Sequence, residues 1–174
     1  MIVEHRRHSM RHKPGRHLSQ EGVDLARRVG ADLGPFDRVV TSTVPRAAET
    51  AVAMGFAVSD EVEALSSLPP GFEDEITWDA GFARMAAIVK RKPDGVVARF
   101  AGELAALLHA LADRLAPDGR LLVVSHGGIV EASAVGCLPD HDLTTWDHAC
   151  NYCEGVRLHL AGGEWHGIEV LRVR

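Results

Sequence analysis

Residues 121–128 read LLVVSHGG, four aliphatic residues followed directly by a serine, a histidine and two glycines. A short apolar run of this kind predicts a buried strand of a mainly parallel sheet. Two other segments have the same form: Ile2-Val3 precedes Arg7-His8-Ser9, and Val39-Val40 precedes residues 42–51, STVPRAAETA. Because ligands bind at the carboxyl ends of strands in an open α/β sheet, we expect the three segments to meet in one crevice.

Strands alternate with helices along the chain, which predicts an α/β fold, a three-layer α/β/α sandwich with a mainly parallel sheet and helices on both faces. Strands are expected at 1–4, 38–41 and 121–125, with a short edge strand near 62–65 and a final hairpin of 153–160 and 167–173 around Gly162-Gly163. Helices are expected from the N-cap Ser19 to Leu33, from Pro45 to about Met54, and at 79–90, 96–115 and 128–135. The loops 5–17 and 60–82 are basic and acidic, respectively.

The composition is that of a soluble globular protein, with 46% hydrophobic and 25% charged residues. A length of 174 residues favours a single domain, 1–174. The net charge of -5 argues against binding nucleic acid or a membrane surface, and no apolar stretch approaches the length of a transmembrane helix. Three cysteines, an odd number, and the lack of a signal peptide favour a cytoplasmic protein. Nothing in the sequence indicates the oligomeric state.

Two histidines and two arginines in these segments suit the transfer of a phosphoryl group. A neutral imidazole can attack phosphorus and form a covalent phosphohistidine. An arginine fork binds phosphoryl oxygens in pairs and keeps its charge. We therefore expect His8 to be the nucleophile, with Arg7, Arg46 and His126 around the phosphate. Arg46 lies in the first turn of its expected helix, whose N-terminus adds a partial positive charge.

The same segments resemble the motifs of the histidine phosphatase superfamily, the phosphoglycerate-mutase-like proteins. Arg7-His8-Ser9 resembles the family's Arg-His-Gly signature, and residues 18–22 (LSQEG) resemble its Leu-Thr-x-x-Gly segment. Residues 42–51 are similar to its arginine segment, and residues 125–128 (SHGG) to its second histidine motif. The resemblance implies a three-layer α/β fold with no metal or other cofactor. It also implies a phosphate site made of the nucleophile His8 with Arg7, Arg46, His126 and the adjoining Gly127.

The sequence departs from the family pattern in three places: at Ser9, in the asparagine often found shortly after the first motif, which has no clear counterpart, and in the acid-bearing segment. Ser9 stands where the family usually has glycine, which is tolerable if the backbone there does not need a positive φ. The acid-bearing segment of the larger members is absent. Spacing from the arginine motif points to Glu73 as the general acid that protonates the leaving group. Asp74, Glu75, or no acid at all are the alternatives, since the segment is equally interpreted as a solvated acidic loop.

The leading hypothesis is a metal-independent phosphatase that hydrolyses a phosphomonoester or phosphohistidine, on a phosphorylated small molecule or a phosphoprotein. The alternatives are a phosphoglycerate mutase and a catalytically idle phosphate-binding module on the same fold. Hydrolysis is preferred because the resemblance implies that mutases are longer, with an insertion and a C-terminal tail that close the site. Loop 10–17 is expected either to close over an acidic leaving group, which we prefer because the loop leaves directly from His8, or to be a hydrated basic loop. Trp78, Trp146 and Trp165 are interpreted as packing residues.

Overall fold

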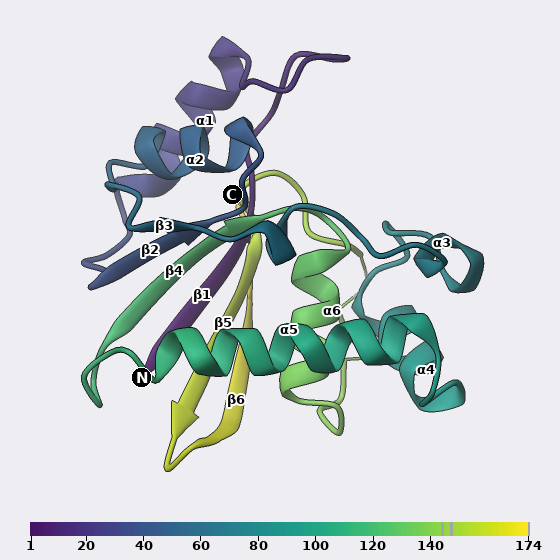
Figure 1. The fold of residues 1–174 in the computed structure, drawn as a ribbon. Coiled ribbons are helices and arrows are strands. Elements are labelled where there is room, and N and C mark those ends of the chain that lie inside the picture. Colours follow the sequence, from purple (N-terminus) through teal and green to yellow (C-terminus); the bar gives the residue numbers. More distant parts are fainter. Residues whose placement is uncertain (144, 147, 174) are drawn as a thin grey trace.

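The computed structural model describes residues 1–143, 145–146 and 148–173, which form one mixed sheet flanked by helices (Figure 1). The strands are β1 (Ile2–Arg7), β2 (Arg38–Thr41), β3 (Asp60–Glu61), β4 (Arg120–Ser125), β5 (Gly155–Ala161) and β6 (Glu164–Leu171). The helices are α1 (Gln20–Gly30), α2 (Pro45–Ala53), α3 (Phe72–Glu75), α4 (Phe82–Arg91), α5 (Val96–Ala112) and α6 (Ile129–Cys137). The strand order is β3-β2-β4-β1-β5-β6, in which β1 to β4 are parallel and β5 and β6 are antiparallel.

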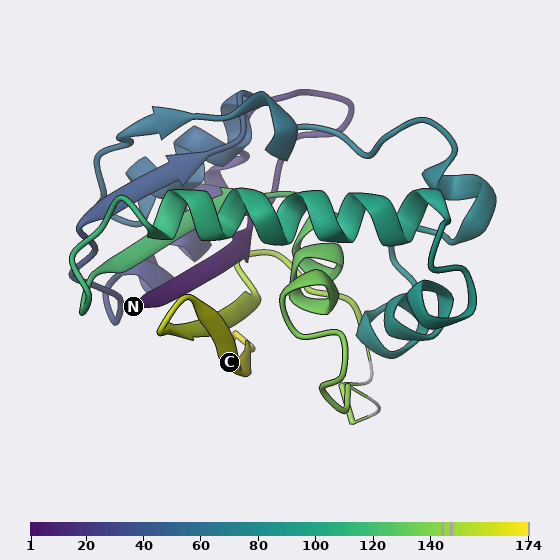
Figure 2. The ribbon, with the colours of Figure 1, turned by 60° about the horizontal axis from the view of Figure 1, so that its bottom comes forward.

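The aliphatic run of β4 is buried on both faces of the sheet. Leu121 and Val123 belong to the larger apolar core, which includes residues of α5 and α6, while Leu122 and Val124 pack with residues of α2. Helices α1 and α2 cover one face and α5 and α6 the other (Figures 1 and 2). Successive side chains of a strand point to opposite faces, so a central strand between two helix layers needs an unbroken apolar run. The expected three-layer α/β architecture is confirmed.

Strand β1 is longer than expected, because its polar residues are paired in the interior. It runs to Arg7 rather than ending at Glu4, and pairs with β4 up to Arg7 beside Ser125. The carboxylate of Glu4 is fully buried and accepts hydrogen bonds from Arg6 and Arg157. A buried charge is tolerated when it is paired in this way. The polar composition of residues 5–7 therefore did not indicate that the buried strand continues to Arg7.

The excursion between α2 and α5 also differs from expectation. The edge strand is Asp60–Glu61, and the expected strand at 62–65 is instead a 3₁₀ turn over Glu63–Leu65. The Val62 amide donates to the Thr41 carbonyl, which is the last hydrogen bond between the two strands. The Val62 carbonyl then accepts from the Leu65 amide, which closes the turn. A short helix, α3, lies within the acidic loop, and α4 begins at Phe82 instead of residue 79. The other boundaries lie within a few residues of those expected.

Two local signals are confirmed. The Ser19 hydroxyl accepts a hydrogen bond from the Gly22 amide at 3.1 Å and caps α1. The β5–β6 hairpin turns at Gly162 and Gly163, both with positive φ, a conformation that glycine adopts without strain. Within the described ranges, no single helix is long and apolar enough to cross a membrane, and α4 and α5, bent by 110°, reach that length and composition only as a pair.

Candidate active site

The structure brings the three motifs to one edge of the sheet. His8, Ser42 and His126 directly follow β1, β2 and β4, which are adjacent and parallel. A cavity of about 220 Å³ lies at these strand ends. Its walls are Arg7, His8, Arg11, Lys13, Arg46, Trp78, His126, Gly127 and Tyr152. Five residues expected at a phosphate site, Arg7, His8, Arg46, His126 and Gly127, therefore meet in one cavity.

His8 presents an unprotonated nitrogen to this cavity. Arg46 Nε donates to His8 Nε2 at 2.9 Å, and His8 Nδ1 lies 2.6 Å from the Ser9 carbonyl oxygen. An arginine only donates and a carbonyl only accepts, so Nε2 carries a lone pair and Nδ1 carries the proton. Burial, as the largest cause, and the nearby His126, Arg46 and Arg7 together lower the pKa of His8 to about 3, against the opposing effect of the Ser9 carbonyl. His8 is thus a neutral imidazole at physiological pH.

His126 is the second histidine of the cavity and is held by Arg46 and Ser42. Arg46 Nη2 lies 3.1 Å from His126 Nδ1, and His126 Nε2 lies 2.8 Å from the Ser42 hydroxyl. The same reasoning places the proton on Nε2, which donates to Ser42. Burial, followed by the charges of Arg46 and Arg7, lowers the pKa of His126 to about 3. His126 donates from Nδ1 to a phosphoryl oxygen only after it gains a proton, which a bound anion would favour.

The cavity concentrates positive charge. The pKa of Arg46 is lowered by burial and then by its cationic neighbours Arg11, Arg16 and Arg7. Lys13 also lies in the wall, and among the described lining residues there is no carboxylate. In a protein of net charge -5, such a cluster is stabilised by an anion that pairs with several of these groups.

Ser9 connects the nucleophile to the helices behind it. Its amide donates to Thr50 Oγ1 at 2.9 Å and its hydroxyl donates to the Gly22 carbonyl at 2.6 Å, while Thr50 Oγ1 donates to the Arg46 carbonyl. Among the described residues other than glycine, only Cys153 has a positive φ, so Ser9 needs no glycine-like backbone. The departure from the family signature at this position is therefore structurally accommodated.

The structure does not bring the expected general acid to the cavity. Glu73 and Asp74 are exposed on α3, whose Phe72 is buried in the core. Glu75 is partly buried, and its carboxylate accepts from the Val97 amide at the start of α5. None of the three acids is among the lining residues. The role of Glu73 stays a prediction from the resemblance, without support from its position.

Trp78 and Tyr152 line the cavity, although sequence reasoning did not place either of them there. The expectation that Trp78 is a packing residue is wrong, because its side chain forms part of the cavity wall. Both residues lie in irregular segments, where no periodic pattern indicates which way a side chain faces. Arg11 and Lys13, from loop 10–17, also line the cavity.

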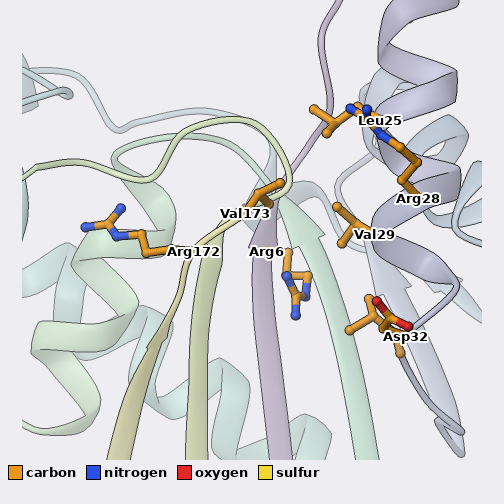
Figure 3. A pocket seen from close by; sticks show the side chains of 8 residues that line it. Arg6, Leu25, Arg28, Val29, Asp32, Arg172 and Val173 are labelled. Atoms are coloured by element: carbon orange, nitrogen blue, oxygen red, sulfur yellow. The ribbon is translucent and has the colours of Figure 1, made fainter.

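A second cavity, of about 420 Å³, lies between α1 and the C-terminal segment (Figure 3). Three arginines contribute to its wall, Arg6, Arg28 and Arg172, and the charges of Arg6 and Arg172 are already paired. Arg6 donates to Glu4 and to the Cys153 carbonyl, and Arg172 donates to Glu154 at 2.8 Å. Figure 3 shows Arg172 directed away from α1. The wall also contains the carboxylate of Asp32, whereas the cavity at His8 has cations and no carboxylate among its described lining residues.

Within the described part of the chain, no group of three or more His, Cys, Asp or Glu side chains is arranged to hold a metal ion. The charged and titratable side chains that line the cavity include two imidazoles, three guanidinium groups and the ammonium group of Lys13.

Comparison with known proteins gives structural matches only. No family model and no curated protein matches the sequence. The fold is similar to phosphoserine phosphatase from Entamoeba histolytica in complex with 3-phosphoglyceric acid, with a TM-score of 0.71 and 17% identity over 99% of this chain and 98% of that one. A protein histidine phosphatase complexed with tungstate matches with a TM-score of 0.59 and 17% identity over 98% and 97% of the two chains.

Phosphoglycerate mutase from Thermus thermophilus matches with a TM-score of 0.60 and 18% identity over 100% of both chains. That mutase is thus of similar length, so the expectation that mutases of this fold are longer is wrong in this case. Phosphatases and a mutase share the architecture described above. The chain therefore has the fold of the histidine phosphatase superfamily structures, the fold that its motifs implied.

Proposed function

We propose that this protein is a metal-independent phosphatase that hydrolyses a phosphomonoester or phosphohistidine through a covalent intermediate on His8. The observation that carries the proposal is the unprotonated Nε2 of His8, which lies in a cavity lined by Arg7 and Arg46. A neutral imidazole beside two guanidinium groups combines a nucleophile with the donors that a phosphoryl group needs.

In the first step, His8 Nε2 attacks phosphorus and the bond from phosphorus to the leaving group breaks, the leaving atom keeping the electron pair. Arg46 Nε, which donates to Nε2 in the structure, is released to bind the phosphoryl oxygens with Arg7. The imidazole becomes positively charged, and its Nδ1–H stabilises this charge by donating to the Ser9 carbonyl. In the second step, water attacks phosphorus, the electron pair of the P–N bond returns to Nε2, and the water proton passes to solvent as inorganic phosphate is released.

The leaving group matters because the described walls contain no carboxyl group that could protonate it. We therefore infer a preference for substrates whose leaving group needs little protonation, such as an aryl phosphate. Such a leaving group departs without protonation by Glu73.

The direct test is hydrolysis of p-nitrophenyl phosphate by the wild type and by His8→Ala, with His166→Ala as a control at an exposed histidine outside the cavity. We expect His8→Ala to lose about a thousandfold or more in kcat, as for removal of other catalytic nucleophiles. His166→Ala should match the wild type, and EDTA should leave both rates unchanged. Hydrolysis that persists in His8→Ala, or that EDTA abolishes and one divalent ion restores, contradicts the proposal.

The competing mutase activity has its own test, since a solved mutase shares the fold. A mutase must protect its phosphohistidine from water while the intermediate reorients. With 3-phosphoglycerate as substrate, we expect phosphate release to exceed formation of 2-phosphoglycerate. Isomerisation faster than release would assign mutase activity instead.

A further inference from the structure

Two aromatic rings lie close to the guanidinium group of Arg7. The Arg7 Cζ lies 4.7 Å from the ring centroid of Tyr152 and 5.2 Å from that of Trp78. Both distances are within the range of attractive cation–π contacts. Arg7 Nη1 also donates to the Cys150 carbonyl at 2.7 Å, whereas its buried Nε has no partner among the described residues. The position of this arginine is therefore set mainly by the two rings and one carbonyl group.

The ring of Trp78 packs against Gly127 and occupies the space that a side chain at this position would need. A Cβ atom at Gly127 would lie 2.9 Å from Trp78 Cζ3 and 3.0 Å from Cε3, closer than real Cβ contacts allow. Gly127 does not have a positive φ, so its small size, and not its backbone freedom, is what the contact requires. Trp78 is 37% exposed, so part of its side chain has no protein neighbour. Its contacts with Gly127 and Arg7 are therefore important for the position of its ring.

Tyr152 belongs to a short segment that also fixes the backbone of Arg7. The Cys153 amide donates to the Arg7 carbonyl, and the Arg7 amide donates to the Glu154 carbonyl. The Tyr152 ring lies 5.9 Å from the ring of His8 as well. One segment thus holds the main chain of Arg7 and places an aromatic ring beside both Arg7 and the nucleophile.

We propose that Trp78 and Tyr152 are positioning residues that clamp the Arg7 guanidinium for phosphoryl binding. This inference rests on the proposed function, because it assigns a role at the same site. A free arginine side chain loses much rotamer freedom when it binds an anion. Because the two rings already restrict the Arg7 side chain, less rotamer freedom is lost when an anion binds. The N–H groups of Arg7 lie in the guanidinium plane and stay available to donate to the phosphoryl oxygens.

The test measures the affinity for orthovanadate by isothermal titration calorimetry, which does not depend on turnover. We expect Trp78→Ala to weaken binding about tenfold, in line with a cation–π contact in a partly buried site. Trp78→Phe and Tyr152→Phe should keep most of the affinity because they retain a ring. Trp165→Phe, which changes a tryptophan outside the cavity walls, should bind as the wild type does. In turnover, Trp78→Ala should raise KM and lower kcat together.

A double-mutant cycle separates the clamp from a general loss of structure. Gly127→Ala should weaken binding in the wild type, because the added methyl displaces the Trp78 ring. In the Trp78→Ala background the same substitution should have less than a twofold effect, because the ring that it displaces is absent. Additive effects, or wild-type affinity in Trp78→Ala, overturn the clamp while leaving the proposed phosphatase intact. A wild type that neither binds orthovanadate nor hydrolyses p-nitrophenyl phosphate overturns both.

Discussion

At the scale of single residues, Arg46 links the two histidines of the cavity. Its Nε and Nη2 donate to His8 Nε2 and His126 Nδ1, so it holds both rings as acceptors. When a phosphoryl group binds, the same N–H groups have oxygens to bind instead, and His8 Nε2 becomes available to attack. The arginine fork is suited to this exchange because it makes paired contacts at a fixed angle.

We expect Arg46→Ala to lower kcat/KM for an aryl phosphate by about 10²–10³-fold, the effect of removing one donor to a developing oxyanion. Arg46→Lys should recover little of this loss, since a lysine ammonium cannot make the paired contacts. Arg91→Ala, at the exposed end of α4, is the matched control. Steady-state kinetics on the three variants is the measurement. A fully active Arg46→Lys would show that only the charge matters.

Glu73 gives a second test at this scale. Because it is exposed on α3 and outside the cavity walls, we expect Glu73→Gln to change kcat/KM by less than about twofold on an aryl and on an alkyl phosphate. A general acid would matter far more for the alkyl substrate, whose leaving oxygen is more basic. A selective loss on the alkyl phosphate would restore Glu73 as the acid, and the comparison needs only these two substrates.

The positions of His8, Arg46 and His126 could be predicted from the sequence because each follows a strand, and parallel strands bring their carboxyl ends together. Trp78 and Tyr152 could not, because their approach to Arg7 depends on the course of two irregular segments. Residue type alone does not distinguish a tryptophan in a core from one in a cavity wall.

At the scale of secondary-structure elements, strands β4 and β1 differ in how clearly the sequence predicts them. The apolar run of β4 meets two helix layers and is recognisable by composition. The second half of β1 carries His5, Arg6 and Arg7, and its burial depends on partners far along the chain. The ring of His5, for example, lies between the hydroxyls of Ser125 and Ser133 at 2.6 and 2.8 Å. Only the assembled sheet supplies these partners.

The crossing of α5 and α6 provides a prediction at this scale. A Cβ atom at Gly136 would lie 2.0 Å from the Ala101 carbonyl oxygen, so Gly136→Ala must push the two helices apart. We expect a loss of unfolding free energy of about 2 kcal/mol or more, as for other overpacked sites. Gly102→Ala, on the exposed side of α5 with no atom near the new methyl, should instead gain up to about 1 kcal/mol. Urea unfolding measures both, and equal effects would contradict the close approach.

At the scale of the whole molecule, buried neutral histidines make stability depend on pH. Burial, as the main cause, lowers the pKa values of His5, His8 and His126 to about 3. In the unfolded chain each histidine takes up a proton below about pH 6.5. The unfolded state therefore binds more protons between about pH 6.5 and 3, and the folded state loses stability as the pH falls through this range.

Each of these histidines should contribute about 1.4 kcal/mol per pH unit to the slope. His5→Gln removes one of them without touching the cavity walls and should make the unfolding free energy less steep between pH 6 and 5. His166→Gln, at an exposed histidine, is the control and should keep the wild-type slope. Urea denaturation at a series of pH values gives the slopes, and identical slopes for the three proteins would contradict buried, neutral histidines.

The whole fold is shared by phosphatases and a mutase, so only the chemistry of the cavity can establish the activity. The most direct measurement is to trap the phosphoenzyme. Protein given ³²P-labelled p-nitrophenyl phosphate is denatured in alkali, and the labelled peptide is located by mass spectrometry. The account predicts label on His8 that is stable in alkali, lost in acid and absent from His8→Ala. Label on another residue, or label retained by His8→Ala, would contradict it.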